Sequence, residues 1–185
     1  MLNYFGKVFT VMLAVLLLYI WPTSETFERQ DDISYLVAFN SVTSFVDSVR
    51  NKGYITPKMY NDFTTELSLT GNLYDIEMEH KHKRYNPVYI DPANPNTFQD
   101  SFNVDYEAFY EKQILSVIFP ANSTAGKSDD SRKYKLTEGD YFSVKIQNTN
   151  KTNAGRLREF LNGGFSPSNL RIYIPYGGMV TNEDY

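Results

Sequence analysis

The sequence predicts an α+β protein in which an N-terminal transmembrane helix continues into an amphipathic helix, followed by a small antiparallel sheet packed with helices. Three observations support this fold class. The run Val8 to Trp21 is uncharged. Apolar residues at helical spacing follow it between residues 33 and 50. Two later segments alternate apolar and polar residues with a period of two, which is typical of half-buried strands.

Length and composition limit the possible classes of protein. The 185 residues suit one small domain plus an anchor, and we place the boundary between residues 1–28 and 29–185. A formal net charge of −4 argues against a nucleic-acid-binding protein. The absence of cysteine excludes a disulfide scaffold, a thiolate zinc site and a cysteine nucleophile. The 15 Tyr and 13 Phe are sufficient for a packed core.

The run Val8 to Trp21 is the predicted membrane segment. Its fourteen residues are fewer than the roughly 17–20 that a spanning helix needs, but Leu2, Tyr4 and Phe5 extend it upstream. We therefore expect this run to lie in the lipid bilayer as a single-pass anchor in the cell membrane.

The flanking charges predict an orientation for this anchor. The α-amino group and Lys7 precede the run, whereas four acids and only Arg29 follow it closely; the acids are Glu25, Glu28, Asp31 and Asp32. The positive-inside tendency keeps the N-terminus cytoplasmic and makes the bulk of the chain extracytoplasmic.

Two alternatives to the anchor remain open. A cleaved signal peptide has the same charged start and apolar run, although Trp21-Pro22-Thr23-Ser24 is a poor match to its small-residue cleavage site. The other alternative is the core helix of a soluble protein. The sequence favours the anchor, and it excludes neither the cleaved signal peptide nor the soluble core helix.

Helical spacing continues after the anchor. One apolar stripe runs through Tyr35, Phe39, Val42, Val46 and Val49. Gly53 is the expected end of this helix, and Pro22 could begin it as a second helical segment.

Thr56-Pro57 predicts an N-cap followed by a short helix, which carries Met59, Phe63 and Leu67 and ends near Gly71. Residues 74–81 then alternate as a strand with Ile76 and Met78 on its inner face.

The second half of the chain is predicted to hold two helices and two further strands. Residues 86–98 carry three prolines and are predicted to form a loop, with a short strand at 88–90. A helix is expected next, through Tyr106, Phe109, Tyr110, Ile114 and Val117, and then an exposed segment 121–132. A strand should follow through Phe142, Val144 and Ile146, and then a helix 156–161 closed by Gly163-Gly164. The last expected strand runs through Leu170, Ile172 and Ile174 and ends before Pro175 and Gly177-Gly178.

Ala121 to Ser128 fits a relaxed phosphate-loop pattern in which alanine replaces the first glycine. Such a loop needs a strand before it, for which residues 114–119 are the candidate, and a helix after it. Pro120 interrupts the junction, and the following residues have no apolar helical face. We interpret the segment as an exposed polar loop and predict no nucleotide site.

His80 and His82 are the two histidines of the chain and would point to the same face of a strand. A metal site needs a third ligand, which the sequence does not indicate, and Lys81, Lys83 and Arg84 add positive charge nearby. We interpret the pair as a solvated strand end. No G-x-S-x-G elbow accompanies it, so the sequence predicts no catalytic, cofactor-binding or metal-binding residue and no cofactor.

The order of an apolar helix, an amphipathic helix and a small exported head resembles type IV pilin-like proteins. The segment Glu138 to Ile146 resembles the late strand of minor pilins of the tight-adherence (TadE-like) group. Gly6 before Lys7 lies where a prepilin peptidase would cut. Family members usually carry a glutamate at the fifth position after that glycine, where this sequence has Val11. The resemblance therefore implies a pseudopilin or assembly-platform component of a bacterial surface machine.

Two classes of function follow from this sequence. The first is a non-enzymatic structural or assembly component of a pilus-like or secretion-like envelope machine, whose partners are lipid and other pilin-like or platform subunits. The second is a membrane-tethered extracytoplasmic module that binds a ligand through its aromatic head. An exported enzyme ranks behind both.

Overall fold

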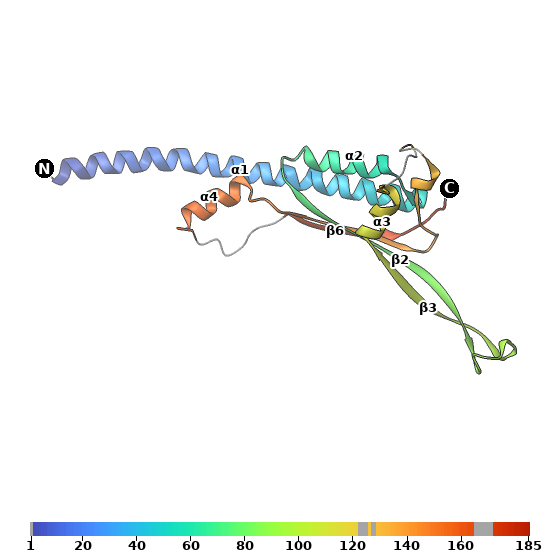
Figure 1. Cartoon of the computed structure of the whole chain (residues 1–185). Helices are drawn as coiled ribbons and strands as arrows, with labels where there is room; N and C mark the ends of the chain where they lie inside the picture. Colours follow the sequence, from blue (N-terminus) through green and yellow to red (C-terminus); the bar gives the residue numbers. More distant parts are fainter. Residues whose placement is uncertain (1, 122–125, 127–128, 165–171) are drawn as a thin grey trace.

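The computed structural model describes residues 2–121, 126, 129–164 and 172–185. It is an α+β structure in which one very long helix, α1 (Leu2–Lys52), runs from a free N-terminal half into a head built on a four-stranded antiparallel sheet (Figure 1). The predicted α+β class, the long apolar N-terminal helix and the small antiparallel sheet packed with helices are therefore confirmed.

Helix α1 spans 51 residues, which corresponds to a length of about 75 Å at the usual rise per residue. It continues through Pro22 without a second start. Around this proline, Thr23 donates its hydroxyl to the Tyr19 carbonyl at 2.8 Å, and Thr26 does the same to the Pro22 carbonyl at 2.8 Å. As expected, Gly53 ends the helix, with a φ of 74°.

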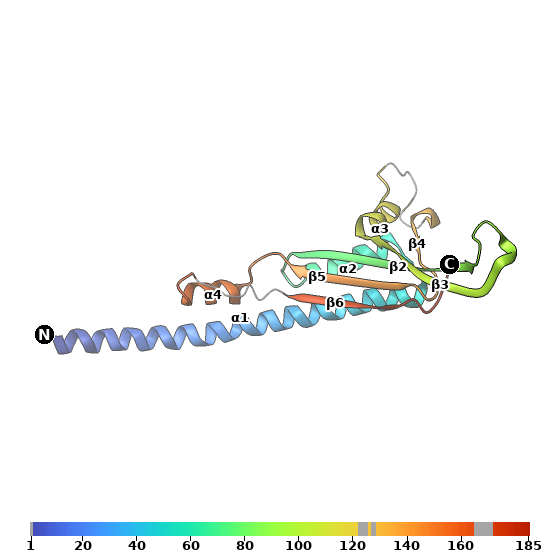
Figure 2. The same cartoon turned by 90° about the horizontal axis from the view of Figure 1, so that it is seen from below.

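The main sheet has the strand order β3-β2-β5-β6, with all neighbours antiparallel. Its strands are β2 (Tyr74–Tyr89), β3 (Phe98–Tyr110), β5 (Tyr141–Asn148) and β6 (Tyr173–Met179). The C-terminal half of α1 lies along this sheet beside β5 and β6, and α2 (Pro57–Ser68) packs next to α1 (Figure 2).

The core lies between α1, α2 and the sheet. Phe142, Val144 and Ile146 are fully buried and Met78 nearly so, while Ile76 is half-buried against them, so the predicted strand phases are confirmed. Of the predicted helical stripe, Val42, Val46 and Val49 are buried, whereas Tyr35 and Phe39 remain 43% and 38% exposed.

Smaller elements close the head. Thr56 caps α2 as predicted, since its hydroxyl accepts from the Met59 amide at 3.2 Å. Helix α4 (Asn153–Leu161) is followed by Gly163 and Gly164 at positive φ, also as predicted. The remaining elements are β1 (Tyr54–Ile55), which pairs with β4 (Tyr134–Lys135), the 3₁₀ turns η1 (Pro95–Thr97) and η2 (Asp130–Arg132), and the helices α3 (Glu111–Ile118) and α4 (Asn153–Leu161).

The predicted helix through Tyr106 to Val117 is wrong in its first half. Residues 98–110 form β3, and only 111–118 are helical. The predicted loop over residues 86–98 is also wrong in part, because β2 runs on to Tyr89. The reason is pairing across strands: Tyr106 lies opposite Lys83 and Phe102 lies opposite Pro87 in a continuous ladder.

The last strand does not end before Pro175. Strand β6 continues through Pro175 and both glycines to Met179, while Leu170 lies outside the described residues. An edge strand tolerates proline because one side of its backbone needs no partner. The glycines are needed for close packing: a Cβ on Gly177 would lie 2.6 Å from Ser143 Cβ, and one on Gly178 would meet the Arg50 guanidinium at 2.6 Å.

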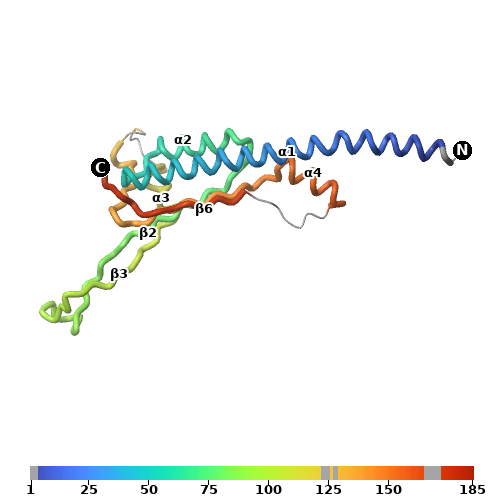
Figure 3. The backbone as a smooth tube through the Cα atoms, turned by 180° about the vertical axis from the view of Figure 1, so that it is seen from behind, coloured from blue at the N-terminus to red at the C-terminus, as the bar shows by residue number. Residues whose placement is uncertain are grey.

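The chain ends at the opposite end of the molecule from its N-terminus (Figure 3). There the C-terminal tail is bonded to the last turn of α1. The Thr181 amide donates to the Arg50 carbonyl at 2.9 Å, and the Asp184 amide donates to the Lys52 carbonyl at 2.9 Å. These bonds satisfy carbonyls that a helix end otherwise leaves without partners.

Candidate functional site

The N-terminal half of α1 projects beyond the head and keeps its apolar side chains exposed (Figure 1). In the described part of the chain, this is the one helix long and apolar enough to cross a membrane, and none of its apolar window is buried within the protein. By length and composition alone, a signal sequence would meet the same criterion.

Helix α4 lies against α1 where α1 leaves the sheet. The Thr152 hydroxyl donates to Asp31 Oδ2 at 2.7 Å, and Arg158 Nη2 lies 2.9 Å from Glu28 Oε1. At the end of α4, Leu161 lines an apolar groove together with Trp21. The domain boundary that the sequence suggests after residue 28 therefore falls within a continuous helix. The α4 region contacts this helix both before and after that boundary.

Beyond the head, β2 and β3 continue as a two-stranded arm, which we define as residues 82–107 (Figures 1 and 3). Pairing between β2 and β5 stops at Lys81 opposite Tyr141, whereas pairing with β3 continues to Tyr89 opposite Phe98. Within the described chain, no further strand pairs with either outer edge of the arm.

The two faces of the arm differ in polarity. Residues directly opposite each other in a ladder share a face, so one face collects exposed apolar side chains; these are Tyr85, Phe98, Phe102, Val104 and Tyr106. The other face is polar: Arg84 Nη1 lies 3.1 Å from Glu107 Oε2, and Asn86 donates to Asp105 at 2.6 Å. The first face is an apolar surface without a partner in the described chain.

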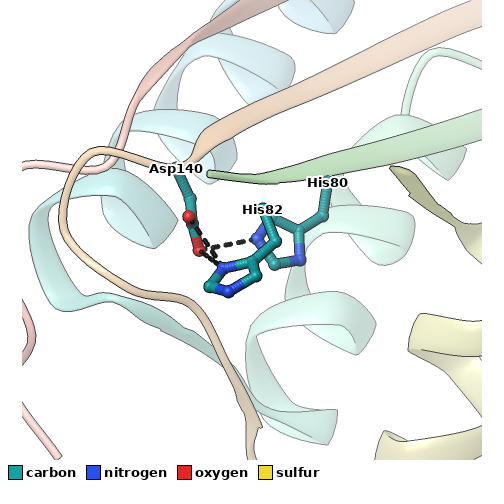
Figure 4. A group of neighbouring side chains, drawn as sticks. All are labelled: His80, His82 and Asp140. Atoms are coloured by element: carbon teal, nitrogen blue, oxygen red, sulfur yellow. Dashed lines mark hydrogen bonds and ion pairs between the residues drawn. The ribbon is translucent and has the colours of Figure 1, made fainter. Parts of the chain in front are cut away.

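The histidine pair lies at the base of this arm, on the same face of β2 as the core residue Met78. His80 and His82 both point towards Asp140, which lies in the turn before β5 (Figure 4). His80 Nε2 is 2.8 Å from Asp140 Oδ2, and His82 Nδ1 is 3.0 Å from Asp140 Oδ1. The interpretation as a solvated strand end is therefore wrong for His80, which is only 4% exposed.

Asp140 is a buried carboxylate with four hydrogen-bond donors. Besides the two imidazoles, the Lys83 amide donates to Oδ1 at 2.9 Å and the Thr137 amide donates to Oδ2 at 2.8 Å. Burial raises the pKa of Asp140, but the hydrogen bonds from the two amides and the two imidazoles outweigh it and hold the pKa of the carboxyl below its usual value. The group is thus stabilised as an anion.

His80 is held from both sides of its ring. Its Nδ1 lies 2.7 Å from the Tyr134 hydroxyl, and Phe109 stacks on the ring with centroids 5.6 Å apart. Burial lowers the pKa of His80, although its hydrogen bond to Asp140 and the charge of that carboxylate act in the opposite direction. A neutral imidazole satisfies both hydrogen bonds: its Nε2–H donates to Asp140, and its Nδ1 accepts a hydrogen bond from the Tyr134 hydroxyl.

Sequence reasoning missed Asp140, because it is distant in sequence from both histidines and no spacing rule relates them. A partial signal was present, since Asp140 lies in the turn just before the predicted strand through Phe142, Val144 and Ile146, but the sequence did not indicate that this strand pairs with the one carrying His80. The relaxed phosphate-loop segment gains no support: residues 122–125 and 127–128 lie outside the described chain, and the residues before them form α3 and not a strand.

The chain matches no protein-family model, and comparisons with curated proteins and with solved structures found no similar protein. Function must therefore be argued from the residues and their arrangement.

Proposed function

We propose that this protein is a non-enzymatic structural or assembly component of a type IV pilus-like or secretion-like envelope machine, held in the cell membrane by its N-terminal helix. The observation that carries this proposal is the division of α1 into two halves. One half exposes apolar side chains on all sides, and the other is packed into a folded head.

A helix that is apolar on all sides is stable where it is surrounded by other apolar groups, and no other part of the described structure buries the apolar window of this helix. A bilayer supplies them along Val8 to Trp21. Trp21 then lies at the level of the headgroups, where tryptophan is enriched. The exposed side chains of Phe160 and Leu161 at the tip of α4 would reach the same level. Lys7 before the run and the acids after it favour a cytoplasmic N-terminus.

Beyond the membrane, α1 continues as an amphipathic helix whose buried side faces the sheet. Its other side exposes Ile33 and Leu36, which are 62% and 58% accessible. Together with the apolar face of the arm, these residues offer surfaces to neighbouring subunits, because exposed apolar patches commonly mark interaction sites. Between helices in lipid, association depends on close side-chain packing.

The resemblance to TadE-like minor pilins agrees with this plan. In that family the apolar helix first holds the precursor in the membrane and later packs in the filament core or base. Val11 occupies the position where the family usually carries glutamate, and Glu25 is the first acid of the chain. A pseudopilin or platform component that stays in the membrane fits this difference better than a major filament subunit.

Site-specific photo-crosslinking in living cells tests the proposal. A photoreactive amino acid at Phe102, on the apolar face of the arm, should give discrete adducts with a second copy or another envelope subunit. The matched control is Asn103, the next residue on the opposite face, which should give few. Equal adducts from both faces, or none from either, would contradict the assembly function.

The alternative is a membrane-tethered module that binds a ligand through its head. The groove between α1 and α2 is lined partly by hydroxyl and carboxylate groups, including Ser41, Ser48, Asp62 and Glu66. Small-molecule sites are usually more apolar and more enclosed than this. We therefore favour assembly over ligand capture.

A further inference from the structure

The cluster of His80, His82 and Asp140 lies where β2 leaves the head and enters the arm. We propose that these three residues bind a divalent transition-metal ion of the zinc type. The ion would connect β2 to the turn before β5 and so fix the base of the arm. This inference is independent of the assembly function.

The donor set has the composition and spacing of a metal site. Within the described residues, this is the one group of three His, Asp or Glu side chains whose ligand atoms all lie within 4.8 Å of one another. Tetrahedral zinc, with bonds of about 2.0–2.1 Å, places neighbouring ligand atoms about 3.3 Å apart. The carboxylate oxygens are now 2.8 Å and 3.0 Å from the two imidazole nitrogens. Small outward shifts of the side chains would therefore admit the ion.

Proton positions also allow coordination. To bind through Nε2, the ring of His80 must carry its proton on Nδ1. The Tyr134 hydroxyl oxygen, 2.7 Å away, can then accept a hydrogen bond from that N–H instead of donating one to the ring. To bind through Nδ1, His82 must likewise carry its proton on Nε2 instead of donating it from Nδ1 to Asp140. Both rings stay neutral, and the amides of Lys83 and Thr137 continue to orient Asp140, as outer contacts do in metal sites.

Of the three positive side chains nearby, two point away from the cluster and the third forms an ion pair with an acid. Lys81 and Lys83 alternate to the opposite face of β2, where Lys81 lies 3.5 Å from Glu79 and Lys83 lies over the Tyr85 ring. Arg84 lies on the same face of β2 as His82, but its charge is paired with Glu107, whose Oε2 lies 3.1 Å from Arg84 Nη1. The His82 side chain is 36% exposed, so water can reach the fourth position of the ion. Two imidazoles and one carboxylate favour zinc over magnesium or calcium, which prefer oxygen ligands.

The test uses the full chain in detergent, carrying an affinity tag without histidine and stripped with a chelator. Zn²⁺ is titrated in competition with a chromogenic chelator. We expect one equivalent to bind. His82→Gln should weaken binding at least 10-fold, and Tyr134→Phe should weaken it by about 10- to 100-fold because it removes the hydroxyl that accepts the hydrogen bond from His80 Nδ1–H. Lys81→Gln, the neighbouring residue on the opposite face, should bind as the wild type does.

Thermal unfolding gives a second readout, because a ligand that binds only the folded state raises the Tm as its concentration increases. At the same concentration, Zn²⁺ should raise the Tm of the wild type and of Lys81→Gln more than that of His82→Gln. Three results would overturn the proposal: no bound Zn²⁺, equal binding by wild type and His82→Gln, or an equal rise in Tm with Mg²⁺.

Discussion

At the scale of single residues, Gly53 ends α1 in a conformation that other residues seldom adopt. Its φ is 74°, and a Cβ there would collide with the backbone oxygen of Asn182. Gly53→Ala should therefore be destabilised by both backbone strain and displacement of the C-terminal tail. Gly71, with a φ of 72° and open space around it, provides the matched control.

We expect Gly71→Ala to cost about 1–2 kcal/mol, the usual penalty for a left-handed residue with a Cβ. Gly53→Ala should cost at least about 1 kcal/mol more, because tight packing must also give way. Denaturant unfolding of both variants measures the difference. Equal losses would mean that the tail adjusts freely around Gly53.

A second residue-scale prediction concerns Phe142 on β5. Its ring is fully buried and lies edge-on to Phe45 of α1, with centroids 6.2 Å apart. Phe142→Ala should lower the free energy of unfolding by about 3–5 kcal/mol, because it leaves a cavity between helix and sheet. Lys145→Ala, exposed on the same strand, should change it by less than about 0.5 kcal/mol. Comparable losses would contradict the strand phase.

At the scale of elements, α4 depends on Thr152. This hydroxyl accepts from the Gly155 amide at 3.2 Å as the N-cap and donates to Asp31 at 2.7 Å. Thr152→Val should remove both hydrogen bonds. The free energy of opening of α4 should then fall by about 1–2 kcal/mol, while that of the sheet is unchanged. Hydrogen exchange of the α4 amides measures this.

The control for α4 is Arg158→Gln, which removes the exposed ion pair with Glu28. Exposed pairs contribute about 0–1 kcal/mol, so exchange in α4 should change little. A larger effect from Arg158→Gln than from Thr152→Val would show that charge, and not the cap, holds α4 to α1.

The arm is the element that the sequence predicts least well. Along β2 the apolar positions have even numbers in the head, as at Ile76 and Met78, and odd numbers in the arm, as at Tyr85. Because of this reversal, the sequence pattern predicts a short strand followed by a loop, although β2 is one long strand. On β3, Phe102, Val104 and Tyr106 do alternate, but the wider spacing of Tyr106, Phe109 and Tyr110 also fits a helix. Pairing with β2 decided between the two.

At the scale of the whole molecule, the head should be independent of the anchor. The continuous core begins in α1 at Ala38, well after Trp21. A variant beginning at residue 29 should therefore be soluble and folded, and its Tm should lie within a few degrees of that of the full chain.

The full chain, in contrast, should sediment with membranes and resist alkaline carbonate, because the apolar window that includes Val8 to Trp21 is not buried within the described structure and a bilayer would cover it. Membrane fractionation with N-terminal sequencing checks this expectation. A soluble product whose N-terminus lies near Glu25 would show that the helix is a cleaved signal.

The histidine–aspartate cluster shows why the site was only half predictable. The rule that residues two apart on a strand share a face correctly put His80 and His82 on one side. Their partner Asp140 and the Tyr134 hydroxyl come from two other segments, and β2–β5 pairing and the β1–β4 pair bring them together. Nothing in the local pattern around the histidines encodes these contacts.

The sequence by itself determined the features that depend on neighbours along the chain. These include the apolar helix, the Thr56 cap, the end at Gly53 and the inward side of β5, because spacing and backbone preference are local properties. Tertiary structure alone decided the length of β2 and β3, the inclusion of Pro175 and the glycines in β6, and the burial of His80. Each of these depends on which distant segment lies alongside, since strand pairing and close packing add free energy that local preference does not contain.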